Sequence, residues 1–196
     1  MTATPREGGP TGVDRLAAGA VIAMAVVGTI IGTATSTLYP QLADRTSSLF
    51  GLSGAVLTAA HVVLLLGVIG LARTNAAGRG WLAQVAYAVL LIGLAAQAIA
   101  EGLLRFNFDA GTAIFGIASP AMALGFVLLG IAVVRAHAWS GWHRFTPLLC
   151  GLYVPIVLIP AFIASGGVSF PVITGWQLCF LLLGLSMWGE ARAAAE

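Results

Sequence analysis

Long apolar runs alternate with short polar segments along almost the whole chain. A membrane-spanning helix needs about 20 mostly apolar residues, because the hydrocarbon core of a bilayer is about 30 Å thick. The runs that reach this length are Leu16–Tyr39, Leu52–Ala72, Trp81–Leu104, Ala113–Val134, Phe145–Ser165 and Phe170–Gly189. The pattern predicts an all-α polytopic membrane bundle of six transmembrane helices over residues 16–190.

The segments outside these runs are short and polar. Residues 1–15 are rich in Gly and Pro, which predicts a disordered tail, and residues 191–196 form a second tail. The first apolar run is longer than the 7–15 residues of a usual signal-peptide core and ends without a small-residue cleavage site. We therefore expect this run to be retained as the first helix.

Composition supports lipid as the solvent. The 196 residues are 59% hydrophobic and 8% charged, whereas an ordinary soluble domain is about 25% charged. A soluble domain of this length has too little interior to bury so much apolar surface. The formal net charge of +2 gives no reason to expect a nucleic-acid partner.

The basic residues indicate an orientation. All nine are arginines, and most lie between the apolar runs. With a cytoplasmic N-terminus, the arginines on the inside are Arg6, Arg15, Arg73, Arg79, Arg135, Arg144 and Arg192. Only Arg45 and Arg105 then lie outside. The positive-inside rule therefore predicts that both termini are cytoplasmic.

Two features bear on how the helices pack. The motifs "LLLGVIGLAR", "VLLGIAVVR" and "LLLGLSMWGEAR" end the second, fourth and sixth runs, which is compatible with three helical hairpins. Abundant Leu and Gly, with arginines at inner helix ends, would give the same pattern, so both interpretations stay open. Gly28, Gly32 and Ser36 form a stripe of small residues that permits close helix contact. Prolines within the fourth and fifth runs predict that both of these helices are kinked: Pro120, Pro155 and Pro160.

Several polar residues lie within the apolar runs. Thr58 and His61 share one helical face with Gly54, and Gln97, Glu101 and Arg105 follow one another at intervals of four residues. Gln177 lies in the sixth run. With cytoplasmic termini, all of these except His61, which is near mid-membrane, fall in the outer half of the bilayer.

This clustering supports two interpretations. Thr58, His61, Gln97, Glu101, Arg105 and Gln177 are candidates to line an outward-facing polar cavity that binds or transports a small molecule or a proton. Alternatively, His61 is satisfied locally, Glu101 and Arg105 form a weak interfacial ion pair, and the other hydrogen bonds only hold helices together. The sequence leaves both open.

Other function classes have less support. A structural or accessory subunit of a larger membrane complex fits the small size and glycine-rich faces. A membrane-embedded lipid-modifying enzyme, with His61 and Glu101 as acid and base, is less favoured because the chain has no phosphate loop, nucleophile elbow or H-E-x-x-H motif. We therefore assign no catalytic residue, metal ligand or cofactor, and we expect His137 and His143 to anchor the membrane interface. The expected partners are lipid, a small-molecule ligand or another membrane protein.

The segments "STLYPQLADR", "AAHVVLLLGVIGL" and "AQAIAEG" together resemble a broad group of small bacterial six-helix membrane proteins. Similar members end their first helix near a proline and carry a histidine in the second. The resemblance covers roughly residues 28–102 and implies a location in a bacterial inner membrane, but no particular activity. It implies roles beyond filling space for Pro40, His61 and Glu101.

Overall fold

A computed structural model describes residues 12–39, 44–166 and 169–194, and this part of the chain is helical without any β-strand. The α-helices are α1 (Gly12–Thr37), α2 (Ser48–Arg73), α3 (Trp81–Leu104), α4 (Phe108–Ala136), α5 (Thr146–Tyr153), α6 (Ile159–Ser165) and α7 (Phe170–Ala193). A 3₁₀ turn, η2 (His143–Phe145), precedes α5, and a π-helical turn, η3 (Val154–Leu158), joins α5 to α6.

Six segments are long and apolar enough to cross a membrane. Five of them lie in single helices, α1, α2, α3, α4 and α7, and the remaining segment combines η2, α5, η3 and α6 over His143–Ser165. The prediction of an all-α bundle with six spans is confirmed, and the chain is a multi-pass membrane protein. The predicted bounds of the third span, Trp81–Leu104, coincide with α3.

Other helices are longer than their apolar runs. α1 begins at Gly12 rather than Leu16, and α4 extends from Phe108 to Ala136. The difference arises because hydropathy marks the part within lipid, whereas backbone hydrogen bonding continues into the headgroup layer. Asn107 caps α4 by accepting a hydrogen bond from the Ala110 N–H at 3.1 Å. Of the predicted N-terminal tail, residues 1–11 lie outside the described residues, as does Pro40.

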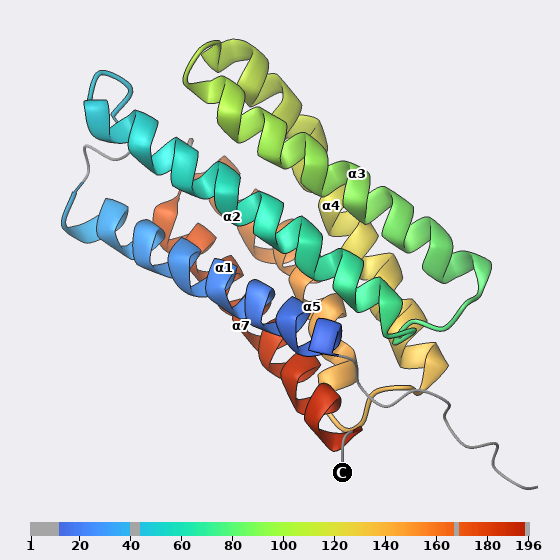
Figure 1. The fold of residues 1–196 in the computed structure, drawn as a ribbon. Coiled ribbons are helices and arrows are strands. Elements are labelled where there is room, and N and C mark those ends of the chain that lie inside the picture. Colours follow the sequence, from blue (N-terminus) through green and yellow to red (C-terminus); the bar gives the residue numbers. More distant parts are fainter. Residues whose placement is uncertain (1–11, 40–43, 167–168, 195–196) are drawn as a thin grey trace, which may run out of the picture.

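The helices form a closed ring (Figure 1). α1 packs on α2, α2 on α3, α3 on α4 and α4 on α5, while α7 packs on both α5 and α1. The contact between α3 and α4 is the most extensive. α1 contacts α7 more extensively than it contacts α2, so three hairpins describe only part of the arrangement.

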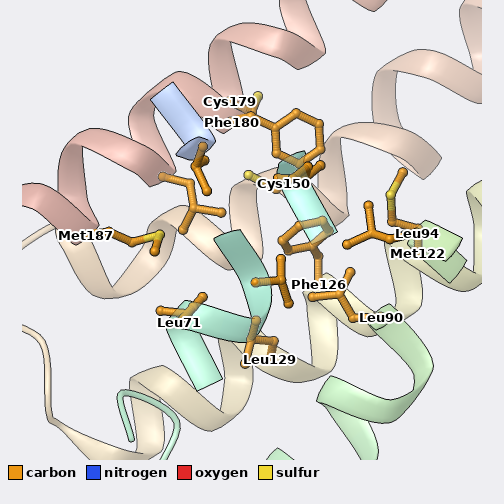
Figure 2. Packing of buried hydrophobic residues seen from close by; sticks show 14 of the residues in the cluster. Leu71, Leu90, Leu94, Met122, Phe126, Leu129, Cys150, Cys179, Phe180 and Met187 are labelled. Atoms are coloured by element: carbon orange, nitrogen blue, oxygen red, sulfur yellow. The ribbon is translucent and has the colours of Figure 1, made fainter. Parts of the chain in front are cut away.

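Phe126 and Phe180 pack among leucine, methionine and cysteine side chains in the hydrophobic core (Figure 2). The Phe180 ring of α7 lies 5.4 Å from the Phe126 ring of α4 and 5.1 Å from the Trp176 ring, measured between centroids. The Trp176 indole N–H donates to the backbone oxygen of Cys150 at 2.9 Å. This bond satisfies the one polar atom of a buried tryptophan, and the centre of the bundle is packed with apolar groups.

A π-helical turn interrupts the regular α-helix of the fifth span at Pro155, where the sequence predicts a kink, whereas Pro120 lies within the continuous helix α4. Pro155 and Pro160 lack the N–H groups that a regular helix would use, and the π-helical turn η3 lies between α5 and α6. Beyond this turn, α6 has no buried residue and packs substantially only on η3. The apolar side chains of α6 therefore face away from the bundle.

The two ends of the bundle differ in charge. The start of α1 and the end of α7 lie at the same end (Figure 1). Among the described residues, the arginines at or near this end are Arg15, Arg73, Arg79, Arg135, Arg144 and Arg192. Arg45 and Arg105 lie at the opposite end, where α2 begins and α3 terminates.

Candidate functional site at the α2–α3 interface

Two glycines of α2 show which face of this helix meets α3. A Cβ added at Gly51 would lie 3.1 Å from Arg105 Cζ, and one added at Gly54 would lie 3.9 Å from the backbone oxygen of Glu101. Thr58 and His61 follow Gly54 at helical spacing and occupy the same face. Arg105 and the backbone of Glu101 therefore lie at the α2–α3 interface, and helical spacing places Thr58 and His61 on the same face of α2.

The polar groups of α2 bond within their own helix. The Thr58 hydroxyl donates to the Gly54 backbone oxygen at 2.8 Å. His61 Nδ1 lies 2.9 Å from the backbone oxygen of Leu57. The neutral tautomer with its proton on Nδ1 donates this hydrogen bond, and Nε2 is then an acceptor. His61 is half-buried and is not one of the buried residues of the apolar core.

Glu101 and Arg105 do not pair. Among the described residues, the Glu101 carboxylate takes part in no hydrogen bond or ion pair, and the Arg105 guanidinium lies over Gly51 instead. The backbone oxygen of Glu101 is level with Gly54 of α2. His61 is seven residues further along α2, which is about 10 Å along the helix axis. No hydrogen bond in the described chain joins the Glu101 carboxylate to the His61 ring.

The two glutamines lie at other interfaces. The Gln97 side-chain oxygen accepts a hydrogen bond from the Ser119 hydroxyl at 3.3 Å, across the α3–α4 interface. Gln177 of α7 packs against Gly28 of α1, and its buried side-chain oxygen has no hydrogen-bond partner within the described part of the chain. Thr174 packs against Gly32 in the same way. Two members of the predicted stripe, Gly28 and Gly32, thus make room for polar side chains of α7, whereas Ser36 is exposed.

A cleft of about 420 Å³ opens at the bundle end away from the termini. It lies where the start of α2 meets the end of α3 and the start of α4. Its lining residues are Arg45, Ser47, Ser48, Phe50, Gly51, Leu104, Arg105, Phe106 and Phe108. Arg105 connects this arginine cleft to the α2–α3 interface, because its guanidinium reaches back over Gly51.

Short capped turns hold the cleft in shape. Ser47 caps α2 by accepting a hydrogen bond from the Leu49 N–H at 3.1 Å. Asp44 accepts hydrogen bonds from the Thr46 N–H at 2.9 Å and from its hydroxyl at 2.8 Å. These bonds, the backbone one first, lower the pKa of the Asp44 carboxyl below its ordinary value. The carboxylate is therefore engaged by the turn and not by Arg45.

Aromatic rings contact both arginines of the cleft. Arg45 Cζ lies 4.1 Å from the centre of the Phe108 ring, and Arg105 Cζ lies 5.9 Å from that of Phe106. Sequence reasoning identified Arg105 but missed Arg45, Ser47 and Ser48. Arg45 could have been found in the sequence, because Arg45 and Arg105 are the two arginines assigned to the outside.

A second polar cluster, also missed from the sequence, lies at the end near the termini. Glu190 Oε1 accepts hydrogen bonds from the Ser140 N–H and hydroxyl, both at 2.9 Å, and lies 2.8 Å from His143 Nδ1. We call Ser140, His143 and Glu190 the loop clamp. His143, expected to act only as an interfacial anchor, thus has a specific partner on α7.

No family model, curated protein or solved structure matches this chain. The function must therefore be inferred from the residues of the α2–α3 interface and the arginine cleft.

Proposed function

We propose that this protein binds a small molecule at the end of the bundle away from its termini. The observation that carries the proposal is the arginine cleft, which opens directly above the polar α2–α3 interface. Its volume falls within the range of about 300–1,000 Å³ that is usual for small-molecule sites. No passage through the bundle is needed for binding at this position.

The proposed orientation makes this end extracytoplasmic. Six of the described arginines lie at or near the terminal end and two at the cleft end, and an excess of arginine in short loops marks the cytoplasmic side. The bacterial inner membrane follows from the resemblance to small bacterial membrane proteins. The ligand would accordingly reach the cleft from outside the cell.

Within this proposal, the α2–α3 interface responds to the ligand. Glu101 lies one helical turn from Arg105 and lacks a partner among the described residues, so a ligand that reorients Arg105 would change the electrostatic surroundings of Glu101. Ionisable groups at membrane depth commonly mark ligand and proton sites. Glu101 and His61 are the candidates to take up or release a proton with binding.

A thermal-stability screen of the purified full-length chain tests binding. Compounds that are neutral, anionic and cationic are added to the protein in detergent, and melting temperatures are compared. A ligand at 100 times its Kd stabilises the bound state by about 2.7 kcal/mol, which for this size gives a shift of roughly 5–10 °C. The proposal is wrong if no compound of any charge shifts the melting temperature.

A matched pair of variants then locates the response. Thr58→Val should weaken ligand-induced stabilisation because Thr58 lies on the α2 face toward α3. Thr29→Val is the control, since Thr29 also donates to a backbone oxygen four residues earlier, at the same 2.8 Å, but lies on α1. Equal behaviour of the two variants would show that the α2–α3 interface does not respond to the ligand.

The exposed face of α6 supports a second candidate function, an accessory subunit of a larger membrane complex. Phe162 and Ile163 are 51% and 74% exposed, and α6 packs on no other spanning helix to a substantial extent. A transmembrane helix of a partner protein would fit this apolar face. Co-purification from native membranes, repeated with Phe162→Ala, tests this alternative. Loss of a partner in the variant supports it, and a wild-type chain recovered alone argues against it.

Enzymatic action on lipid has the least support. General acid–base catalysis needs both groups within hydrogen-bond reach of the substrate proton, directly or through one water. In the described chain the His61 ring bonds to the Leu57 backbone oxygen, and no hydrogen bond or ion pair joins it to Glu101.

A further inference from the structure

Two arginines from separate segments converge on one cleft without a carboxylate partner. Arg45 precedes α2 and Arg105 follows α3, yet both line the same cavity. The one ion pair among the described residues is His143–Glu190, at the other end of the bundle. Asp44 is bonded to Thr46, and Asp109, in the first turn of α4, forms no ion pair among the described residues, so neither guanidinium has a carboxylate at ion-pair distance.

The helices around the cleft compensate this charge only in part. α2 begins here, and its first turn has no acidic residue, so the positive end of its dipole adds to the two guanidinium groups. Ser47 already caps this end, and we assign no ligand contact to the backbone amides. The C-terminal end of α3 beside Arg105 offsets some of the charge. The cleft therefore has a positive potential that an anion would relieve.

We propose that the arginine cleft binds a phosphate group, held between the Arg45 and Arg105 guanidiniums. This inference rests on the proposed function and names its ligand class. A guanidinium presents parallel N–H donors that match the oxygens of a phosphate. The Ser47 oxygen accepts the Leu49 N–H, so its hydroxyl proton is free to donate to the same group.

The position of the cleft allows two sources of phosphate. Phe106 is 82% exposed beside the cleft, and aromatic side chains at this level typically mark the headgroup layer of a bilayer. A lipid headgroup in the outer layer would place its phosphate here, and a soluble phosphate compound could enter from the aqueous side. Phe50 and Leu104 supply an apolar surface for the rest of either ligand.

The experiment separates the two sources. The full-length chain in dodecyl maltoside is titrated with inorganic phosphate against chloride at constant ionic strength, and binding is measured by calorimetry. In parallel, the chain in mixed micelles is offered phosphatidylglycerol or an uncharged, phosphate-free galactolipid, and retained lipid is measured by native mass spectrometry. Binding of either phosphate source, in preference to chloride or the galactolipid, supports the proposal.

Three variants decide whether the cleft is responsible. The double change Arg45→Gln and Arg105→Gln should weaken phosphate or phosphatidylglycerol binding at least about tenfold, because hydrogen bonds to charged groups are the strong ones. Arg45→Gln alone, in a connection outside the helices, should show a similar loss if the double variant does not fold. Arg73→Gln is the control, since Arg73 is exposed at the other end of α2.

The outcomes are distinct for the two proposals. Unchanged binding in both arginine variants, or no binding of phosphate and phosphatidylglycerol, overturns the phosphate assignment. If uncharged or cationic compounds still stabilise the protein in the thermal screen, the proposed function survives without the phosphate assignment. If no compound stabilises it and neither phosphate source binds, both are wrong.

Discussion

The imidazole of His143 lies 2.8 Å from Glu190 Oε1, and this contact joins the loop between α4 and α5 to the last turns of α7. A carboxylate near a helix C-terminus is unfavourable by itself, because that end carries partial negative charge. Three hydrogen bonds to the same oxygen, from His143 and Ser140, offset this repulsion. Gly189 gives the ring space, since a Cβ there would lie 3.1 Å from His143 Cε1.

Glu190→Ala should therefore destabilise the protein. It leaves the Ser140 N–H and the His143 ring without their acceptor, and we expect a loss of about 1–2 kcal/mol, limited because water reaches both side chains. Glu190→Gln keeps an acceptor oxygen and should lose less. Reversible unfolding in mixed micelles measures both, and a Glu190→Ala protein as stable as the wild type would show that the loop clamp contributes nothing.

Gly93→Ala should separate α3 from α4. A Cβ at Gly93 would lie 2.7 Å from the backbone nitrogen of Met122, and backbone cannot move aside as a flexible side chain can. Overpacking of this kind costs about 1–3 kcal/mol. Gly116→Ala on α4 is the control, because nothing lies within 4 Å of its added Cβ, and it should be neutral or stabilise by up to about 1 kcal/mol. Two variants of equal stability would contradict the close α3–α4 contact.

The hydrogen bond between Ser119 and Gln97 should be weak. Its length of 3.3 Å and the average of about 0.6 kcal/mol for interhelical hydrogen bonds in membranes both indicate a packing contact. A double-mutant cycle with Ser119→Ala and Gln97→Leu measures the coupling directly. A coupling energy above about 2 kcal/mol would instead assign Gln97 to a strongly organised polar site.

Cysteine labelling should establish the orientation of the bundle. The native Cys150 and Cys179 are free and buried, so introduced exposed thiols can be labelled selectively. With cytoplasmic termini, Ser48→Cys reacts with a membrane-impermeant maleimide in intact cells, whereas Ala193→Cys reacts only after the membrane is opened. The opposite pattern would invert the proposed orientation and place the arginine cleft in the cytoplasm.

The sequence by itself determined the solvent and the number of spans. Burial in lipid demands long apolar runs with internally bonded backbone, and the run Trp81–Leu104 predicted α3 residue for residue. Helical spacing also placed Gly54, Thr58 and His61 on one face, and Pro155 and Pro160 marked the break in the fifth span. These features are local, so a single segment contains all the information they need.

Only the tertiary structure decided which faces meet. Gln177 packs on Gly28, Arg105 lies over Gly51, and Glu190 bonds to a loop near residue 140; none of these pairings follows from hydropathy. Lipid is as apolar as leucine, so helix contacts in a membrane depend on close packing of small residues and on individual hydrogen bonds rather than on hydrophobic pattern. For the same reason, the outside arginines could be counted from the sequence, whereas their convergence with Ser47 on one cleft required the fold.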